Sequence, residues 1–194
     1  MRFKSTIFLA VLLAALCSYL YFIEFPGNAK KKKEEEAKRT VFSFLESDIT
    51  ELIITGGEQS LSLIQLPGHP DTPWKIAEPF EAVADENAAS SFASNLAHLK
   101  IIRKIDENPS SVTTPADLTP FGLAPPLYSI RIILKGPNND LLEVGGDGMS
   151  GNDSPGSYPL YVRVGNAVYL VESGIKTYLT KPLKDWQRQE KINP

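Results

Sequence analysis

Ser173 and Lys176 fit the pattern S-x-x-K, in which a lysine activates a serine for nucleophilic attack. This spacing places both side chains on one face of a helical turn. A pattern with only two fixed positions arises often by chance, and neither S-D-N nor K-T-G accompanies it. The sequence therefore favours a helix cap followed by a surface lysine. A serine hydrolase is retained only as a remote alternative.

A glycine-rich stretch at 145–157, GGDGMSGNDSPGS, holds three oxygen ligands suited to calcium: Asp147, Asn152 and Asp153. An EF-hand loop needs acids at alternating positions and a final glutamate, and this stretch has neither. The run GMSGN also misses the nucleophile elbow G-x-S-x-G, because Asn152 stands at its last position. The composition instead indicates a flexible loop between strands.

The remaining residues capable of chemistry are sparse. His69 and His98 are too few and too far apart in the sequence to form a metal site by themselves. Cys17 is the one cysteine, so the globular part has neither a disulfide nor thiolate chemistry. No glycine-rich phosphate-binding motif leads from a strand into a helix. We therefore expect no catalytic, cofactor-binding or metal site, and a protein that is not an enzyme.

The charge is unevenly distributed along the 194 residues, whose net charge is −3. Residues 40–194 hold 12 Lys and Arg against 19 Asp and Glu, a balance of −7, whereas residues 1–39 hold 8 against 4, a balance of +4. Nucleic-acid-binding domains usually carry a basic face. The acidic globular part argues against a nucleic-acid partner.

A membrane anchor is predicted near the N-terminus. Residues 5–23 carry no charge over 19 positions, and as a helix they would span roughly 28 Å, about the hydrocarbon thickness of a bilayer. We place a four-residue tail at 1–4 and a single-pass transmembrane anchor at 5–25. Two alternatives stay open: a cleaved signal peptide, for which the small-residue cleavage site is poor, and acylation at Cys17, where Leu16 replaces the expected small residue.

A charged spacer is predicted at 26–40, before a globular domain at 41–194. The run AKKKKEEEAKR is typical of a solvated spacer, and its three glutamates weaken the alternative of a polybasic lipid-binding patch. Orientation stays open on these grounds. The Lys and Arg count favours a cytoplasmic C-terminal side, whereas a short basic start before an apolar run is typical of an export signal.

The globular part is rich in segments of alternating hydrophobicity, which predict strands. Gly56-Gly57-Glu58 and Gly165-Asn166 predict hairpin turns. No regular alternation of strand and helix is present, which argues against a doubly wound parallel sheet. The predicted strands are 49–56, 60–66, 74–79, 101–106, 127–135, 140–146, 158–165 and 167–172.

One central helix is predicted within 84–100, where Asp85 caps the N-terminus and apolar residues recur every three or four positions. His98 falls beside that stripe, which indicates an exposed histidine. Two short helices are predicted at 173–180 and 183–190. The fold class is therefore α+β: a mainly antiparallel sheet with one central helix and short C-terminal helices, preceded by the transmembrane helix.

The segment 117–126 reads as a turn into the following strand. Asp117 and Thr119-Pro120 predict a helical turn, and Gly122 suits a positive φ at its end. Phe121 and Leu123 are predicted to enter the core. The segment from Ala124 to Pro126 is predicted to be extended, because proline restricts the residue before it.

The order of these signals resembles the bacterial family called domain of unknown function 4340, over roughly residues 60–186. The matching motifs are WKIAEP, the helix ending NLAHLKIIR, the segment DLTPFGLAPP before a strand, and a late hairpin. The signature residues, taken as structural, are Trp74, Pro79, Asp85, Asp117, Leu118, Phe121, Gly122, Leu123, Pro125, Tyr161, Val162 and Tyr169.

The resemblance implies an N-terminal membrane segment with a periplasmic domain, anchored by a single pass in the bacterial inner membrane. It also implies genes neighbouring gliding-motility-type ABC transporter permeases. No catalytic residue follows from it. We therefore expect a non-enzymatic accessory or scaffold domain of a cell-envelope or ABC-transport complex, with membrane-protein partners. The alternative is a glycan-binding module, which requires Trp74, Tyr158 and Tyr161 exposed on one face.

Overall fold

The computed structural model describes residues 39–57, 59–68, 73–105, 115–149 and 158–189. From Thr40 onward these residues belong to one compact unit. None of the helices in these ranges is long and apolar enough to cross a membrane. The anchor predicted at 5–25 lies outside the described residues.

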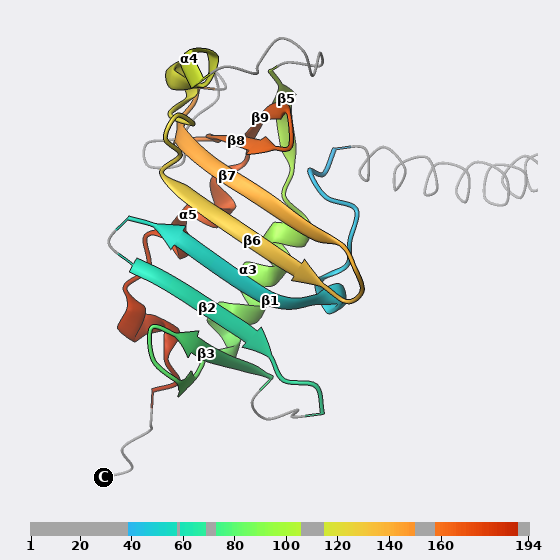
Figure 1. Cartoon of the computed structure of the whole chain (residues 1–194), viewed down its shortest axis with the longest axis vertical. Helices are drawn as coiled ribbons and strands as arrows, with labels where there is room; N and C mark the ends of the chain where they lie inside the picture. Colours follow the sequence, from blue (N-terminus) through green and yellow to red (C-terminus); the bar gives the residue numbers. More distant parts are fainter. Residues whose placement is uncertain (1–38, 58, 69–72, 106–114, 150–157, 190–194) are drawn as a thin grey trace, which may run out of the picture. The chain divides into compact units, whose positions relative to one another are not determined.

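The described part of the chain is built on one antiparallel sheet (Figure 1), in the order β4-β3-β2-β1-β6-β7-β8-β9-β5. This confirms a mainly antiparallel α+β fold. The strands are β1 (Ile49–Gly56), β2 (Gln59–Gln65), β3 (Trp74–Glu78), β4 (Ala82–Val83), β5 (Ile101–Lys104), β6 (Tyr128–Leu134), β7 (Asn139–Asp147), β8 (Leu160–Val164) and β9 (Ala167–Val171).

Both predicted hairpins are present. β1 and β2 pair up to Gly56 opposite Gln59, and β8 and β9 pair up to Val164 opposite Ala167. Each connection therefore has two residues, the shortest common hairpin loop. The centre of the sheet depends on a longer-range pairing, because β1 also lies beside β6, with Leu52 opposite Ile132.

The predicted central helix is α3 (Glu86–Ala97), which lies behind the sheet in Figure 1. Asp85 caps it, since its carboxylate accepts a hydrogen bond of 2.7 Å from the backbone N–H of Ala88. The expected apolar stripe is buried, with Ala89, Phe92 and Leu96 fully inaccessible. The cap and the stripe together fix where the helix begins and which side faces the sheet.

The main core fills the space between α3 and the inner face of the sheet. Inward side chains from every central strand contribute, among them Leu52, Ile132 and Val162, each fully buried. Phe92 of the helix contacts Trp186 edge-to-face at 5.7 Å and Tyr178 at 5.3 Å. Aromatic pairs at this spacing add stability beyond their buried area.

Short helical turns complete the chain on the helix side of the sheet. They are η2 (Glu46–Asp48), before β1, and η4 (Ser173–Ile175), α5 (Lys176–Leu179) and η5 (Leu183–Trp186), after β9. The helix predicted at 173–180 is thus present as η4 and α5. The helix predicted at 183–190 is wrong beyond Trp186, since Gln187 is extended.

The chain after Trp186 is extended because it pairs with the edge strand β4. Gln187 forms a bridge with Ala84, and the backbone N–H of Arg188 donates to the carbonyl of Val83 at 3.0 Å. These hydrogen bonds satisfy main-chain groups that an edge strand would otherwise leave unpaired. Pairing with a distant segment therefore overrides the local preference for helix.

The segment 117–126 forms a second, smaller hydrophobic cluster. α4 (Pro115–Leu118) continues into η3 (Thr119–Phe121), and Gly122 follows with φ +67°, as predicted. Leu118 and Leu123 pack on Val168. Tyr169, next in β9, packs on the main core, so the alternation of a strand places Val168 on the opposite face.

Two expectations for this segment are corrected. Phe121 and Leu123 pack in the smaller cluster rather than in the main core, and Phe121 is only half-buried. The stretch expected to be extended is a tight turn, with a cis peptide between Ala124 and Pro125 and a bridge between Leu123 and Pro126. The turn brings the chain back to the sheet at β6.

Candidate functional site

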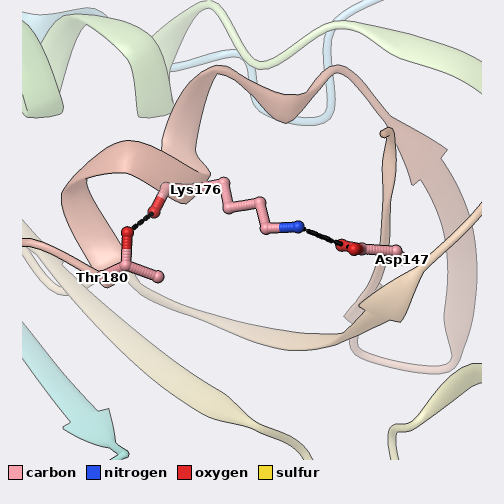
Figure 2. Close-up of polar contacts among 3 residues, drawn as sticks. All are labelled: Asp147, Lys176 and Thr180. Carbon is pink, nitrogen blue, oxygen red and sulfur yellow. Dashed lines mark hydrogen bonds and ion pairs between the residues drawn. The ribbon is translucent and has the colours of Figure 1, made fainter. Parts of the chain in front are cut away.

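Lys176 of α5 is paired with Asp147 at the end of β7. Its ammonium donates to both carboxylate oxygens of Asp147, at 2.6 and 2.7 Å (Figure 2). Lys176, one half of the S-x-x-K pattern, thus links α5 to the end of β7 through Asp147.

A small cavity lies beside this ion pair. Its volume is about 250 Å³, below the range of roughly 300–1,000 Å³ typical of small-molecule sites. The hydroxyl of Thr180 donates to the backbone carbonyl of Lys176 at 3.0 Å (Figure 2), so it is already used within the helical turn. The lining is mostly apolar and consists of Leu127, Tyr128, Val144, Gly145, Asp147, Leu160, Lys176, Leu179 and Thr180.

Replacing Lys176 with methionine is expected to change the free energy of unfolding by less than about 1 kcal/mol, because exposed ion pairs contribute little. The side chains of Lys176 and Asp147 are 35% and 46% exposed. Urea denaturation followed by circular dichroism measures the change. Lys75→Met is the control, since its pair with Glu81 is longer, at 3.8 Å. A loss above about 2 kcal/mol for Lys176→Met alone would contradict a minor role.

No three metal-ligating side chains come together within the described ranges. His98 is exposed, as predicted, and its Nδ1 lies 2.9 Å from the carbonyl of Ser94 at the end of α3. The proposed calcium ligand Asp147 is engaged by Lys176. His69, Asn152, Asp153 and Cys17 lie outside the described residues.

The three aromatic residues required for a glycan-binding face do not share one. Trp74 is 2% exposed, and its indole N–H donates to Ser90 on α3 at 3.2 Å. The ring of Tyr161 packs on Phe121 at 5.0 Å, whereas Tyr158 is exposed. Trp74 therefore belongs to the core, and the glycan-binding alternative lacks the surface on which it depended.

The outer face of the sheet carries a surface that sequence reasoning missed, which we call the outer patch: Ile53, Arg131, Ile133 and Leu141. Figure 1 shows α3 behind the sheet and no described helix in front of β1 and β6. Arg131 is exposed, and the register places it directly between Ile53 and Leu141 on the neighbouring strands. Leu141 is 46% exposed.

Arg131 has no ion pair with any side chain in the described part of the chain. The nearby cross-strand pair differs, because Arg163 donates to Glu143. An exposed arginine that has no ion pair among the described residues and is flanked by two aliphatic side chains on the neighbouring strands is typical of a surface that meets another molecule. The available sequence signal was Leu141 between the polar residues Asn139 and Glu143 at alternate positions, which share its face of the strand. The strand register was still needed to show that Leu141 lies beside Arg131.

Five of the signature residues lie in or next to regular secondary structure. Trp74 begins β3, Pro79 follows that strand, and Asp85 caps α3. In the second hairpin, Val162 and Tyr169 lie opposite each other on the core side. These five residues therefore lie in β3, in the turn after it, at the cap of α3 and in the β8–β9 hairpin.

Two of the other signature residues are in close backbone contact with β7. Phe121 and Gly122 lie directly against Gly145 and Gly146 of β7. A Cβ at Gly145 would lie 2.2 Å from the carbonyl oxygen of Phe121, and a Cβ at Gly122 would lie 2.7 Å from the N–H nitrogen of Gly146. Distances below about 3 Å leave no room for a side chain, so each position requires glycine.

Comparison with known families matches residues 74–192 to the domain of unknown function 4340 (DUF4340). The chain belongs to this family. The match to DUF4340 starts and ends later than the range expected from the motifs, residues 60–186. No curated protein and no solved structure matches the chain.

The DUF4340 match begins at Trp74, so it does not include β1 and β2. These two strands nevertheless occupy the middle of the sheet, where β1 joins β2 to β6. All of the signature residues, and both glycines of the β7 contact, lie inside the matched range. The DUF4340 segment therefore accounts for the helix and most of the sheet, while the preceding residues complete it.

Proposed function

We propose that this protein is a non-enzymatic, membrane-anchored accessory or scaffold domain of a cell-envelope or ABC-transport complex, acting through protein–protein contacts. The outer patch is the observation that carries the proposal. It presents the Arg131 guanidinium, which forms no ion pair with any described residue, between Ile53 and Leu141 on the outer face of the sheet. Such a surface fits a partner that places a carboxylate among apolar side chains.

The proposed location is the bacterial inner membrane, with residues 5–25 as the anchor and the domain on the periplasmic side. The uncharged run of 19 residues supports an anchor. Alkaline phosphatase fused to the C-terminus tests the orientation, because the enzyme is active only where disulfides form. An inactive fusion would place the domain in the cytoplasm and contradict this part of the proposal.

Replacing Arg131 with glutamate is expected to reduce capture of the membrane partner at least tenfold, since it places two carboxylates against each other. The tagged full-length chain is used to pull down partners from native membranes in mild detergent, and the captured protein is quantified by mass spectrometry. Lys184→Glu, an exposed position in η5, makes the same charge change away from the patch.

Loss of the same partner with Arg131→Glu but not with Lys184→Glu supports the proposal. Equal capture by both variants and the unmodified chain would overturn the role of the outer patch. Circular dichroism of each variant separates a binding defect from a folding defect, because Arg131 is exposed and its replacement removes no core contact.

A further inference from the structure

The two edge strands of the sheet, β4 and β5, differ in whether another described segment pairs with their outer side. At β4 the C-terminal segment closes the edge, with Gln187 bridging Ala84 and Arg188 hydrogen-bonded to Val83. At the other edge, β5 is the last strand, and β9 is its neighbour on one side only. An edge strand exposes a row of N–H and C=O groups that another strand can pair with.

The chain that precedes β1 pairs with the residues just before β5 and so sets where the unpaired part of this edge begins. Thr40 forms an antiparallel bridge with Lys100, and the N–H of Val41 donates to the carbonyl of Leu99 at 2.9 Å. From Ile101 to Lys104, no residue in the described ranges pairs with the outward side of β5. Among the described residues, the edge is therefore paired just before β5 and unpaired along it.

The side chains of β5 give this open edge a defined chemistry. Lys100, Arg103 and Lys104 are exposed and form no ion pair with any described residue. Ile102, between them, is 45% exposed. The edge of this acidic domain is thus locally basic, with one aliphatic side chain at its centre.

The register separates the two basic side chains of the strand. Arg103 lies opposite Leu170, and Lys104 lies opposite Tyr169, whose ring packs on the main core. Because successive residues of a strand face opposite sides of the sheet, Arg103 and Lys104 project to different faces. A strand added to β5 would meet one cation on each face.

We propose that β5 is a docking edge for an extended, acidic segment of a partner protein, which joins the sheet as a further strand. Two consecutive acidic residues in that segment would face opposite sides and reach Arg103 and Lys104 respectively. Main-chain hydrogen bonds would supply affinity, and the charges would select the partner and its register. The β5 edge shares no residue with the outer patch, so the test of one proposed surface does not decide the other.

Basic residues on an edge strand have another common use, which is to prevent aggregation by repelling other edges. The two roles predict different behaviour. A protective edge rejects every added strand, whereas a docking edge accepts one of complementary charge. The open main chain between Ile101 and Lys104 is therefore tested directly with a strand-forming peptide.

The test measures binding of a labelled short peptide of valine and threonine, with two central glutamates, to the full-length chain in detergent by fluorescence anisotropy. The unmodified chain is expected to bind it. The double variant Arg103→Glu, Lys104→Glu is expected to weaken binding at least tenfold, and the same variant is expected to bind a peptide with two central lysines instead. Lys184→Glu serves as the control and is expected to bind like the unmodified chain.

A second peptide separates strand addition from simple charge attraction. It keeps the two glutamates but carries N-methyl groups on alternate backbone nitrogens, which removes the donors that a new strand would offer. At least tenfold weaker binding of this peptide supports the proposal. Equal binding of both peptides, no binding of either, or dimers of the chain that the Arg103→Glu, Lys104→Glu variant abolishes would each overturn it.

Discussion

Replacing Gly122 with alanine is expected to lower the free energy of unfolding by about 2–4 kcal/mol. Two effects add at this position. The φ of +67° is unfavourable for any residue with a Cβ, and the new Cβ would lie 2.7 Å from the backbone nitrogen of Gly146. The neighbour is main chain and cannot rotate away, so η3 and β7 would have to separate. Urea denaturation of the purified domain-containing chain measures the loss.

Gly165→Ala provides the matched control. Gly165 has a similar φ of +57° in the β8–β9 turn, but a Cβ there would meet nothing within 4 Å. Its replacement is therefore expected to lower the free energy of unfolding by roughly 1 kcal/mol, the cost of a positive φ for a residue with a Cβ. Equal losses for the two variants would show that contact with β7 contributes nothing, and an unchanged Gly122→Ala protein would refute the close packing altogether.

Replacing Trp186 with alanine is expected to destabilise the domain by about 3–5 kcal/mol, as is usual for a buried tryptophan. The side chain is 2% exposed and contacts the rings of Phe92 and Tyr178. Its backbone carbonyl also accepts from the N–H of Asp85 at 2.7 Å, directly at the start of α3. Loss of the indole would leave a cavity beneath the helix and loosen that junction.

Phe80→Ala is the control for an aromatic residue that is not in the core. Phe80 is 43% exposed, and its replacement is expected to change stability by less than about 1 kcal/mol. Thermal unfolding followed by near-ultraviolet circular dichroism compares the two variants. A melting temperature for Trp186→Ala equal to that of Phe80→Ala would show that η5 is dispensable for the domain.

Local patterns predicted the strands and the helix well, because their causes are local. Alternation in 127–135 placed Ile130 and Ile132 on the buried face. The cap at Asp85 and the stripe through Phe92 located α3. The positive φ at Gly122 also followed from its neighbours, since a glycine after a helical turn commonly takes that conformation.

The features that the sequence did not predict depend on contacts between distant segments. Gln187 is extended because Ala84 lies beside it, about a hundred positions earlier in the chain. Arg131 and Leu141 become one surface only through the β6–β7 register. Lys176 fitted a catalytic pattern, but its partner Asp147 lies on another element. Periodicity contains no information about such pairings, so only the assembled fold reveals them.

The hydrogen bond between Asp85 and Trp186 also constrains how the protein is made. During synthesis, α3 and the first four strands leave the ribosome long before residues 186–188 exist to hold them. The edge of β4 and the side of Phe92 that Trp186 covers then stay unprotected until those residues have been translated. A chain released before residue 186 would therefore expose both surfaces together, which makes it a substrate for chaperones and proteases rather than a shorter folded domain.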